Sequence, residues 1–263
     1  PANGEDAAVP SVSWLDENPD ERMPALSLAV EDGWLPDAPQ LGAIAKLGIG
    51  SLLMRTASDA INGLLGDVRP LQAALNASID LEVIIPDDGD PDQELGCVAD
   101  TCNEFGLRPD HLFALPRGFL ANYQPDGDWP QGVDVDEACR AARRAFPDAQ
   151  IGGGMLTNFI EFNRKRPPLD DCDYVSHGTN ATIHAADDRS VMETLEALPA
   201  VFRSARIIAP DKPCRLGMLS IGMRTNPHGP LDRNDTQTRR PMALHDPRHR
   251  ALFGAAWALG VVS

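Results

Sequence analysis

The chain has 263 residues, 43% of them hydrophobic, and 23 basic against 39 acidic side chains give it a formal net charge of −16. This length suits one α/β domain, and the acidic balance argues against nonspecific binding to nucleic acid or to an anionic membrane. The sequence contains neither an apolar run near the ~18 residues of a membrane helix nor a recognisable signal peptide. We therefore expect a cytoplasmic protein with no nucleic-acid and no membrane partner.

The first 24 residues are rich in proline, acidic residues and asparagine and show little periodicity, which predicts an irregular lead-in. Residues 25–263 then form the predicted barrel domain. Within it, short apolar runs recur every 25 to 40 residues or so, as successive strand-helix units require. The expected strands are 25–30, 50–56, 81–86, 111–117, 149–154, 173–179 and 215–224.

Amphipathic segments between these runs predict helices that cover a sheet. They span residues 40–48, 59–78, 93–106, 136–146 and 190–208. Asp92, Asp136 and Ser190 fit N-caps or first-turn positions of three of them. Strands with few polar interruptions that alternate with helices indicate a parallel sheet buried on both faces.

An open doubly wound sheet and a (β/α)₈ TIM-type barrel both satisfy this pattern. The barrel is favoured because seven units follow one another without the G-x-G-x-x-G turn of a dinucleotide fold. An eighth strand is not evident, since residues 246–263 read as the helix after the seventh strand, capped by Asp246. Either the chain is a fragment, or a strand lies in the lead-in, or the barrel closes by other means.

The five cysteines are scattered and form no C-x-x-C pair, so we expect reduced thiols. Cys97 and Cys102 are five apart on a predicted helix, which favours core packing over zinc. No phosphate-binding loop, zinc-protease motif or suitably placed Schiff-base lysine is present. The sequence therefore predicts chemistry without a metal or organic cofactor.

Polar side chains recur just after the predicted strands, on the face where barrel enzymes build their active sites. They are Arg55, Asp87, Asp88, Arg117, Asn158, Glu161, His177, Asn180, Arg224 and Asn226.

Glu161 follows the run of three glycines at 152–154 and has Asn158, Asn163 and Arg164 as neighbours. A carboxylate in that setting can act as a general base whose protonation its neighbours control. Equally, Glu161 and Arg164, three apart at a helix start, can form a surface ion pair. The pattern alone leaves both interpretations open.

His184 and Asp188 belong to the segment 181–190, after the sixth predicted strand. His184 fits neither an amphipathic helix nor a core position, so we expect it to donate to a substrate oxygen or to move a proton. Asp188 fits the first turn of the following helix better than a substrate contact, because acids favour the positive helix end.

Three arginines follow strands: Arg55, Arg117 and Arg224. A guanidinium can bind a carboxylate or a polarised carbonyl through two hydrogen bonds, or it can pair with an acid on a neighbouring strand. If the three converge on one face, they indicate a small, oxygen-rich ligand.

Four stretches, 151–168, 184–197, 224–229 and 246–260, resemble in order and spacing the D-apionate lactonase family of bacterial carbohydrate catabolism, whose barrel looks like that of glycoside hydrolases. The resemblance implies hydrolysis of a sugar-acid lactone by base-activated water. It assigns functional positions to Asn158, Glu161, His184, Asp188, Arg224 and Asn226. The run before His184 and the absence of an eighth strand with its glutamate are departures from the family pattern.

The function that we expect is a lactonase-like hydrolase whose partner is a small sugar acid or lactone. Its predicted catalytic residues are Glu161, His184 and Arg224, and its predicted substrate-binding residues are Asn158, Arg55, Arg117, Asp188 and Asn226. Alternatives are a glycoside hydrolase, with Asp87, Asp88 or Asp188 as the second carboxylate, a noncatalytic carbohydrate-binding barrel, and a metal-dependent sugar isomerase or epimerase. The sequence does not indicate the oligomeric state.

Overall fold

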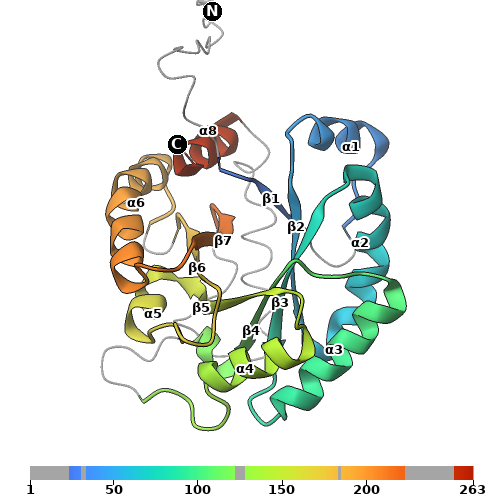
Figure 1. Cartoon of the computed structure of the whole chain (residues 1–263). Helices are drawn as coiled ribbons and strands as arrows, with labels where there is room; N and C mark the ends of the chain where they lie inside the picture. Colours follow the sequence, from blue (N-terminus) through green and yellow to red (C-terminus); the bar gives the residue numbers. More distant parts are fainter. Residues whose placement is uncertain (1–23, 31–33, 122–127, 183–184, 223–251, 263) are drawn as a thin grey trace, which may run out of the picture.

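A computed structural model of the chain describes residues 24–30, 34–121, 128–182, 185–222 and 252–262. Seven strands in these ranges form one sheet in the order of the chain, and each runs parallel to the next (Figure 1). The strands are β1 (Ser27–Val30), β2 (Ser51–Ala57), β3 (Ser78–Ile85), β4 (His111–Pro116), β5 (Gln150–Asn158), β6 (Tyr174–Asn180) and β7 (Cys214–Ser220). The sheet curls into a nearly closed TIM-type barrel, which confirms the predicted fold class.

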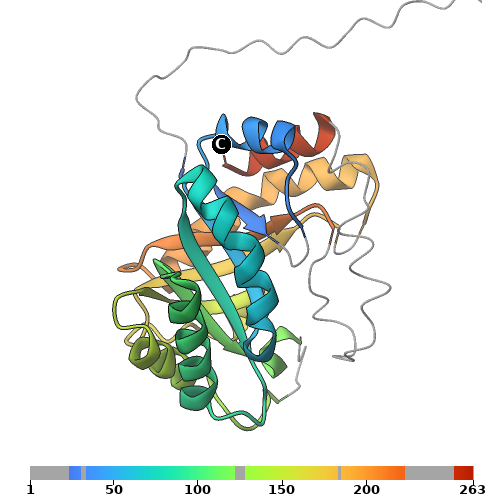
Figure 2. The ribbon, with the colours of Figure 1, turned by 90° about the vertical axis from the view of Figure 1, so that its right-hand side faces the viewer.

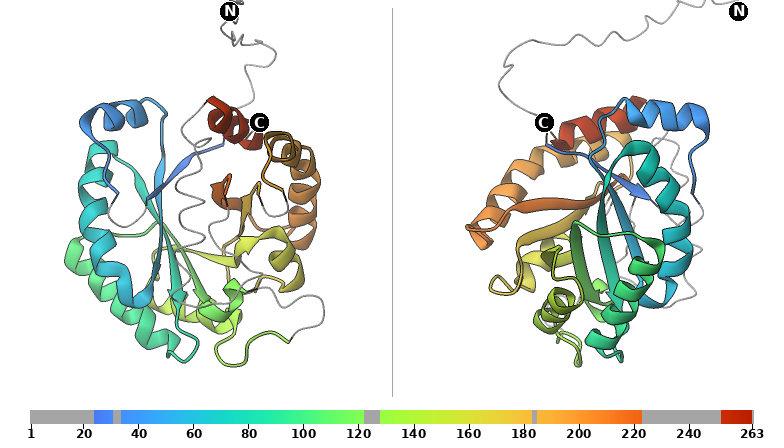
Figure 3. Two further views of the ribbon diagram at one scale, coloured as in Figure 1. Left: turned by 180° about the vertical axis from the view of Figure 1, so that it is seen from behind. Right: turned by 45° about the vertical axis from the view of Figure 1, so that its right-hand side comes forward.

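Helices connect the strands and lie outside the sheet, on both flanks when the molecule is seen from behind (Figure 3). Those after β1 to β4 are α1 (Ala38–Ala45), the short 3₁₀ helix η1 (Ser58–Ala60) with α2 (Ile61–Leu75), α3 (Pro91–Phe105), and the 3₁₀ helix η2 (Arg117–Leu120) with α4 (Val135–Ala145). Those after β5 to β7 are α5 (Phe159–Arg164), α6 (Asp188–Ile208) and α8 (Leu252–Val262). Figure 2 shows α2 and α3 side by side along the outer face.

The ends of the helices follow from local sequence. Asp90 caps α3 by accepting hydrogen bonds from the backbone N–H groups of Asp92 and Gln93, and Pro91 fits the first turn because that position needs no N–H donor. Gly106 ends the helix with a φ of +64°, a conformation that costs glycine little.

The predicted caps are partly corrected. Asp92 and Asp136 lie in the first turns of α3 and α4, where their charge favours the helix. Ser190 is not a cap: its backbone N–H instead donates to the carboxylate of Asp187, which caps α6. An aspartate two or three positions upstream of the expected residue performs the capping in each case, and the third such aspartate is Asp134.

Two apolar clusters hold the described residues together. The larger one packs β2 to β5 against α2, α3 and α4, with Leu52, Leu65 and Leu112 fully buried. The smaller one joins α6 and α8 beside the end of β7, through side chains that include Val191, Ile221 and Trp257. The barrel therefore has one densely packed half and one half with a smaller core.

Some predictions fall outside the described ranges, namely the lead-in up to residue 23 and the cap at Asp246. The described ranges contain seven strands and no eighth. None of the described helices combines the length and the apolar character that a membrane crossing demands.

Candidate active site at the carboxyl ends of the strands

A small polar recess lies at the carboxyl ends of β5, β6 and β7, next to the carboxyl-terminal half of β2. We call it the strand-end recess; its lining residues are Arg55, Leu156, Thr157, Asn158, Gly178, Thr179, Asn180, Met218 and Ser220. Asn158, Asn180 and Ser220 are the last residues of their strands. The recess has a volume of about 10 Å³, close to the roughly 10–15 Å³ that a single water needs.

Arg55 reaches the recess from β2 while bound to an acid on the neighbouring strand. Its Nε lies 2.6 Å from Oε2 of Glu82 on β3, and only 10% of the Arg55 side chain is exposed. The Nη2 atom is buried and has no hydrogen-bond partner in the described part of the chain. The expected pairing with a neighbouring acid therefore exists, and it leaves one donor of the guanidinium unused.

Asn158 and Asn180 form an amide pair across the ends of β5 and β6. Nδ2 of Asn180 donates to Oδ1 of Asn158 over 3.0 Å, and Oδ1 of Asn180 is buried without a partner among the described residues. The hydroxyl of Thr157, on the same strand end as Asn158, is buried and unpartnered as well. Unpaired buried polar groups are rare because each costs free energy, so these two atoms and Nη2 of Arg55 call for an explanation.

Glu161 lies in the first turn of α5, three residues after Asn158. Its carboxylate accepts the backbone N–H of Asn158 over 3.2 Å, within a capping box that starts the helix. Glu161 is 1% exposed, so the surface ion pair with Arg164 that the pattern allowed is wrong. The structure thus places this carboxylate beside the recess, behind the residue that lines it.

The glycine run before this site is explained by close packing inside the barrel. A Cβ on Gly152 would lie 2.5 Å from the ring of Tyr174. Gly154 has a φ of +126° and would place a Cβ 2.3 Å from the carbonyl oxygen of Ser176. Only glycine permits both approaches, and they bring β5 against β6 so that the two asparagines meet.

The other predicted site residues are not brought into the recess by the described part of the structure. Arg117 begins η2 after β4 and has a buried Nε without a partner in the described residues, but it does not line the recess. Asp188 is exposed in the first turn of α6, the position its sequence favoured. His184, Arg224 and Asn226 lie outside the described residues.

Several lining or supporting groups were not predicted as site residues. Glu82 lies in a mostly apolar strand that also contains Asp80, and an acid in such a strand indicates a buried partner for a cation. Asn180 was visible as a polar residue at a strand end. Thr157 and Ser220 gave no signal, because small hydroxyl residues are common in strands.

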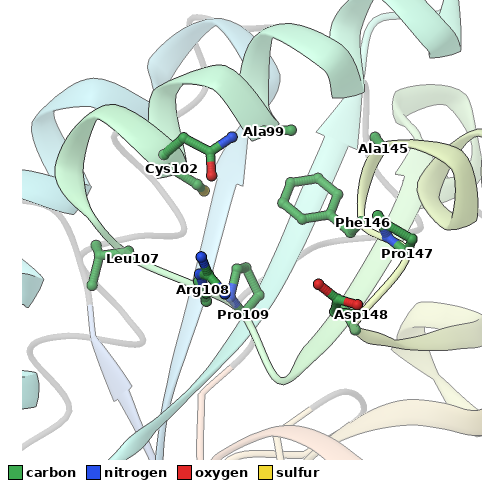
Figure 4. A pocket seen from close by; sticks show the side chains of 11 residues that line it. Ala99, Cys102, Leu107, Arg108, Pro109, Ala145, Phe146, Pro147 and Asp148 are labelled. Carbon is green, nitrogen blue, oxygen red and sulfur yellow. The ribbon is translucent and has the colours of Figure 1, made fainter.

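Two larger cavities lie elsewhere. One of about 600 Å³ follows the seam between β1 and β7 and reaches Asp80, Glu82, Tyr174 and Arg215 inside the barrel. The other, of about 210 Å³, is a surface groove between the ends of α3 and α4, where Cys102, Leu107 and Phe146 lie around it (Figure 4). It lies at the amino ends of β4 and β5, on the opposite side of the barrel from the recess.

Burial governs the thiols and the buried imidazole. It raises the pKa of Cys102 to about 11 and that of Cys139 to about 12, so both stay protonated. Cys102 is in the core as expected, whereas Cys97 is exposed, which corrects its predicted packing. His177, between Phe159 and Phe162, has a pKa below its ordinary value because burial disfavours the imidazolium, an effect that the bond to the Gly178 carbonyl partly offsets.

Comparison with known proteins identifies relatives by sequence. A family model described as the TIM barrel domain of D-apionate lactonase matches residues 28–263. A D-apionate lactonase of Brucella anthropi is 40% identical over 194 residues, which cover 73% of this chain and 32% of that protein. The chain therefore spans about a third of the length of this curated relative.

Solved structures with a similar course of the chain are more distant. A GH26 β-mannanase from Bacteroides ovatus is 12% identical, with 76% of this chain and 73% of that chain covered and a TM-score of 0.47. A fungal β-1,4-galactanase is 13% identical, with 69% and 65% covered and a TM-score of 0.43. The family model and the 40% identical relative, by contrast, decide the assignment: this chain belongs to the D-apionate lactonase TIM barrel domain family.

Proposed function

We propose that this domain hydrolyses a sugar-acid lactone of the D-apionate kind and binds part of it at the strand-end recess. The observation that carries the proposal is the set of unpartnered buried groups there, with a guanidinium donor from Arg55 and an amide acceptor from Asn180. Sugar lactones and acids are dense in oxygens that match such groups. The 40% identical relative named D-apionate lactonase supports the same substrate class.

In the proposed reaction, Glu161 acts as the general base. Its carboxylate takes a proton from water, the water oxygen attacks the ring carbonyl, and donors stabilise the oxyanion. The bond to the ring oxygen then breaks, and the proton passes to the alkoxide to give the open hydroxy acid. His184 and Arg224 are proposed to polarise the carbonyl, while Asn158, Arg55, Arg117, Asp188 and Asn226 are proposed to position the substrate.

Glu161→Gln separates this role from helix capping. A capping box accepts glutamine as well as glutamate, so the variant keeps the bond to the Asn158 N–H and removes the base. We expect hydrolysis of apionolactone and other aldonolactones, followed as acid release above the spontaneous rate, to fall by about 10²- to 10⁴-fold. The free energy of unfolding should change little.

Glu193→Gln is the matched control, because Glu193 is an exposed glutamate paired with Arg189 on α6. It should hydrolyse the lactones at the wild-type rate. Wild-type activity in Glu161→Gln would remove Glu161 from catalysis and leave it with the capping role. A folded wild-type chain that hydrolyses none of the lactones would overturn the proposed function.

A further inference from the structure

The strand-end recess has room for about one oxygen atom, and the groups around it have defined hydrogen-bonding roles. Arg55 can only donate, since a guanidinium has no acceptor. The bond from its Nε to Glu82 fixes the plane of the fork and leaves Nη2 as the free donor.

The orientation of the two amides follows from the hydrogen bond between them. Nδ2 of Asn180 donates to Oδ1 of Asn158 over 3.0 Å, because an amide oxygen can only accept. The oxygen of Asn180 is buried without a partner in the described part of the chain, so it is the atom that stays free.

Three unpartnered groups therefore line the recess: the donor nitrogen Nη2 of Arg55, the acceptor oxygen of Asn180, and the hydroxyl of Thr157, which can donate or accept. The first two select the group that fills it. A hydroxyl accepts from Arg55 Nη2 and donates to Asn180 Oδ1 at the same time. A carbonyl or carboxylate oxygen satisfies the guanidinium but sets lone pairs against the amide oxygen. An ammonium group satisfies the amide but repels the guanidinium.

We propose that the strand-end recess is a subsite for one hydroxyl of the sugar-acid ligand and that Asn180 is the specificity-determining residue that reads it. The inference rests on the proposed function, whose substrate class it narrows to lactones with a hydroxyl at one required position. An analogue that lacks that hydroxyl leaves both buried groups unpaired, which weakens binding by about 10²-fold.

The test measures binding rather than turnover. Aldonates, the ring-opened acids, are titrated into the wild-type chain by calorimetry, together with a series in which each member lacks a different hydroxyl. We expect one member to bind about 10²-fold more weakly than the parent and the others to lose much less. In Asn180→Ala, the ratio of the affinities for the parent aldonate and for that one analogue should fall to within a few-fold of one.

The circular dichroism spectrum and the urea midpoint of Asn180→Ala should stay near those of wild type, which separates the lost contact from a general loss of structure. Asn163→Ala, which changes an exposed asparagine of α5, should behave as wild type. The proposal is overturned if Asn180→Ala keeps the wild-type ratio, if all members bind alike, or if the folded chain binds no aldonate. Position-dependent binding without hydrolysis of any lactone would instead refute only the lactonase.

Discussion

Two groups of polar side chains lie in the same barrel near opposite ends of its strands, and they differ in how far their hydrogen-bonding groups pair with one another. The lower cluster consists of Ser27, Ser51, Asp80, His111 and Arg215, all at or near the starts of their strands. Asp80 Oδ2 accepts bonds from Ser27 over 2.8 Å, from Ser51 over 2.6 Å and from Arg215 over 2.8 Å. The strand-end recess leaves Arg55, Thr157 and Asn180 with unused groups.

The difference supports a structural role for the lower cluster and is consistent with the ligand-binding role proposed for the strand-end recess. A buried charge is tolerated when several donors converge on it, as they do on Asp80. His111 also contacts both members of the Asp80–Arg215 pair. Its Nδ1 lies 2.9 Å from Asp80 Oδ1 without the angle of a hydrogen bond, and its Nε2 lies 2.9 Å from Nη1 of Arg215. The amino ends of barrel strands usually serve stability and the carboxyl ends serve function.

The largest expected effect comes from breaking the lower cluster. Asp80→Ala removes the acceptor that three donors share and leaves Arg215 without its carboxylate. Removing one partner of a fully buried ion pair costs about 3–5 kcal/mol of unfolding free energy. Because 37% of the Arg215 side chain is exposed, we expect a loss near the lower end of that range, measured by urea denaturation followed by circular dichroism. The fraction that remains folded should keep the wild-type affinity for aldonates.

Asp92→Asn supplies the comparison for that experiment. Asp92 pairs with Arg144 on the surface through two hydrogen bonds. Exposed ion pairs contribute little to stability, so the urea midpoint of the Asp92→Asn variant should stay near that of wild type. An Asp80→Ala chain as stable as wild type would show that the lower cluster is not structural.

The sequence predicts the fold well because periodicity reports burial along each element. All seven strands were placed within a few residues, and the alternation with helices selected a parallel sheet. Asp92 and Asp136 lie in first turns as predicted, but the capping residues themselves are two or three positions upstream of the expected ones, since an Asp-rich stretch such as 87–92 offers several residues with the same chemistry. Which of them caps depends on where the backbone turns, and that is set by packing.

The next effect in size concerns the recess and its guanidinium. Arg55→Lys keeps a positive charge opposite Glu82 but loses the second arm of the fork. We expect kcat/KM for the best lactone substrate to fall by about 10²-fold, comparable with the loss of one preorganised donor, with a much smaller change in unfolding free energy than Asp80→Ala causes. A wild-type kcat/KM in this variant would exclude Arg55 Nη2 from the site.

The candidate site was less predictable than the fold. Arg55 and Asn158 could be read from strand ends, because parallel strands bring their carboxyl ends to one face. Which strand-end residues share one recess depends on the bulge in β5 between Met155 and Asn158 and on the register with β6. A sequence pattern does not contain these offsets, so the strand-end position of Asn180 was predicted but its place in the recess, and Thr157 altogether, emerged only from the structure.

The smallest expected effect concerns His177, a buried polar residue of β6 that belongs to neither cluster. Its folded pKa lies below the unfolded value of about 6.5 because burial disfavours the charged ring. Above pH 6.5 the ring is neutral in both states and stability is complete. As pH falls below that value, the unfolded chain takes up a proton first, so the unfolding free energy declines by up to about 1.4 kcal/mol per pH unit until the folded pKa is reached.

His177→Asn keeps an N–H donor for the Gly178 carbonyl and removes the titration of the imidazole. Urea denaturation between pH 4.5 and 7.5, roughly the window set by that imidazole, should show a steeper decline for wild type than for the variant. An equal pH dependence of the unfolding free energy in wild type and variant would mean that His177 has the same pKa in the folded and unfolded chain. The burial of its ring would then not affect the stability of the fold.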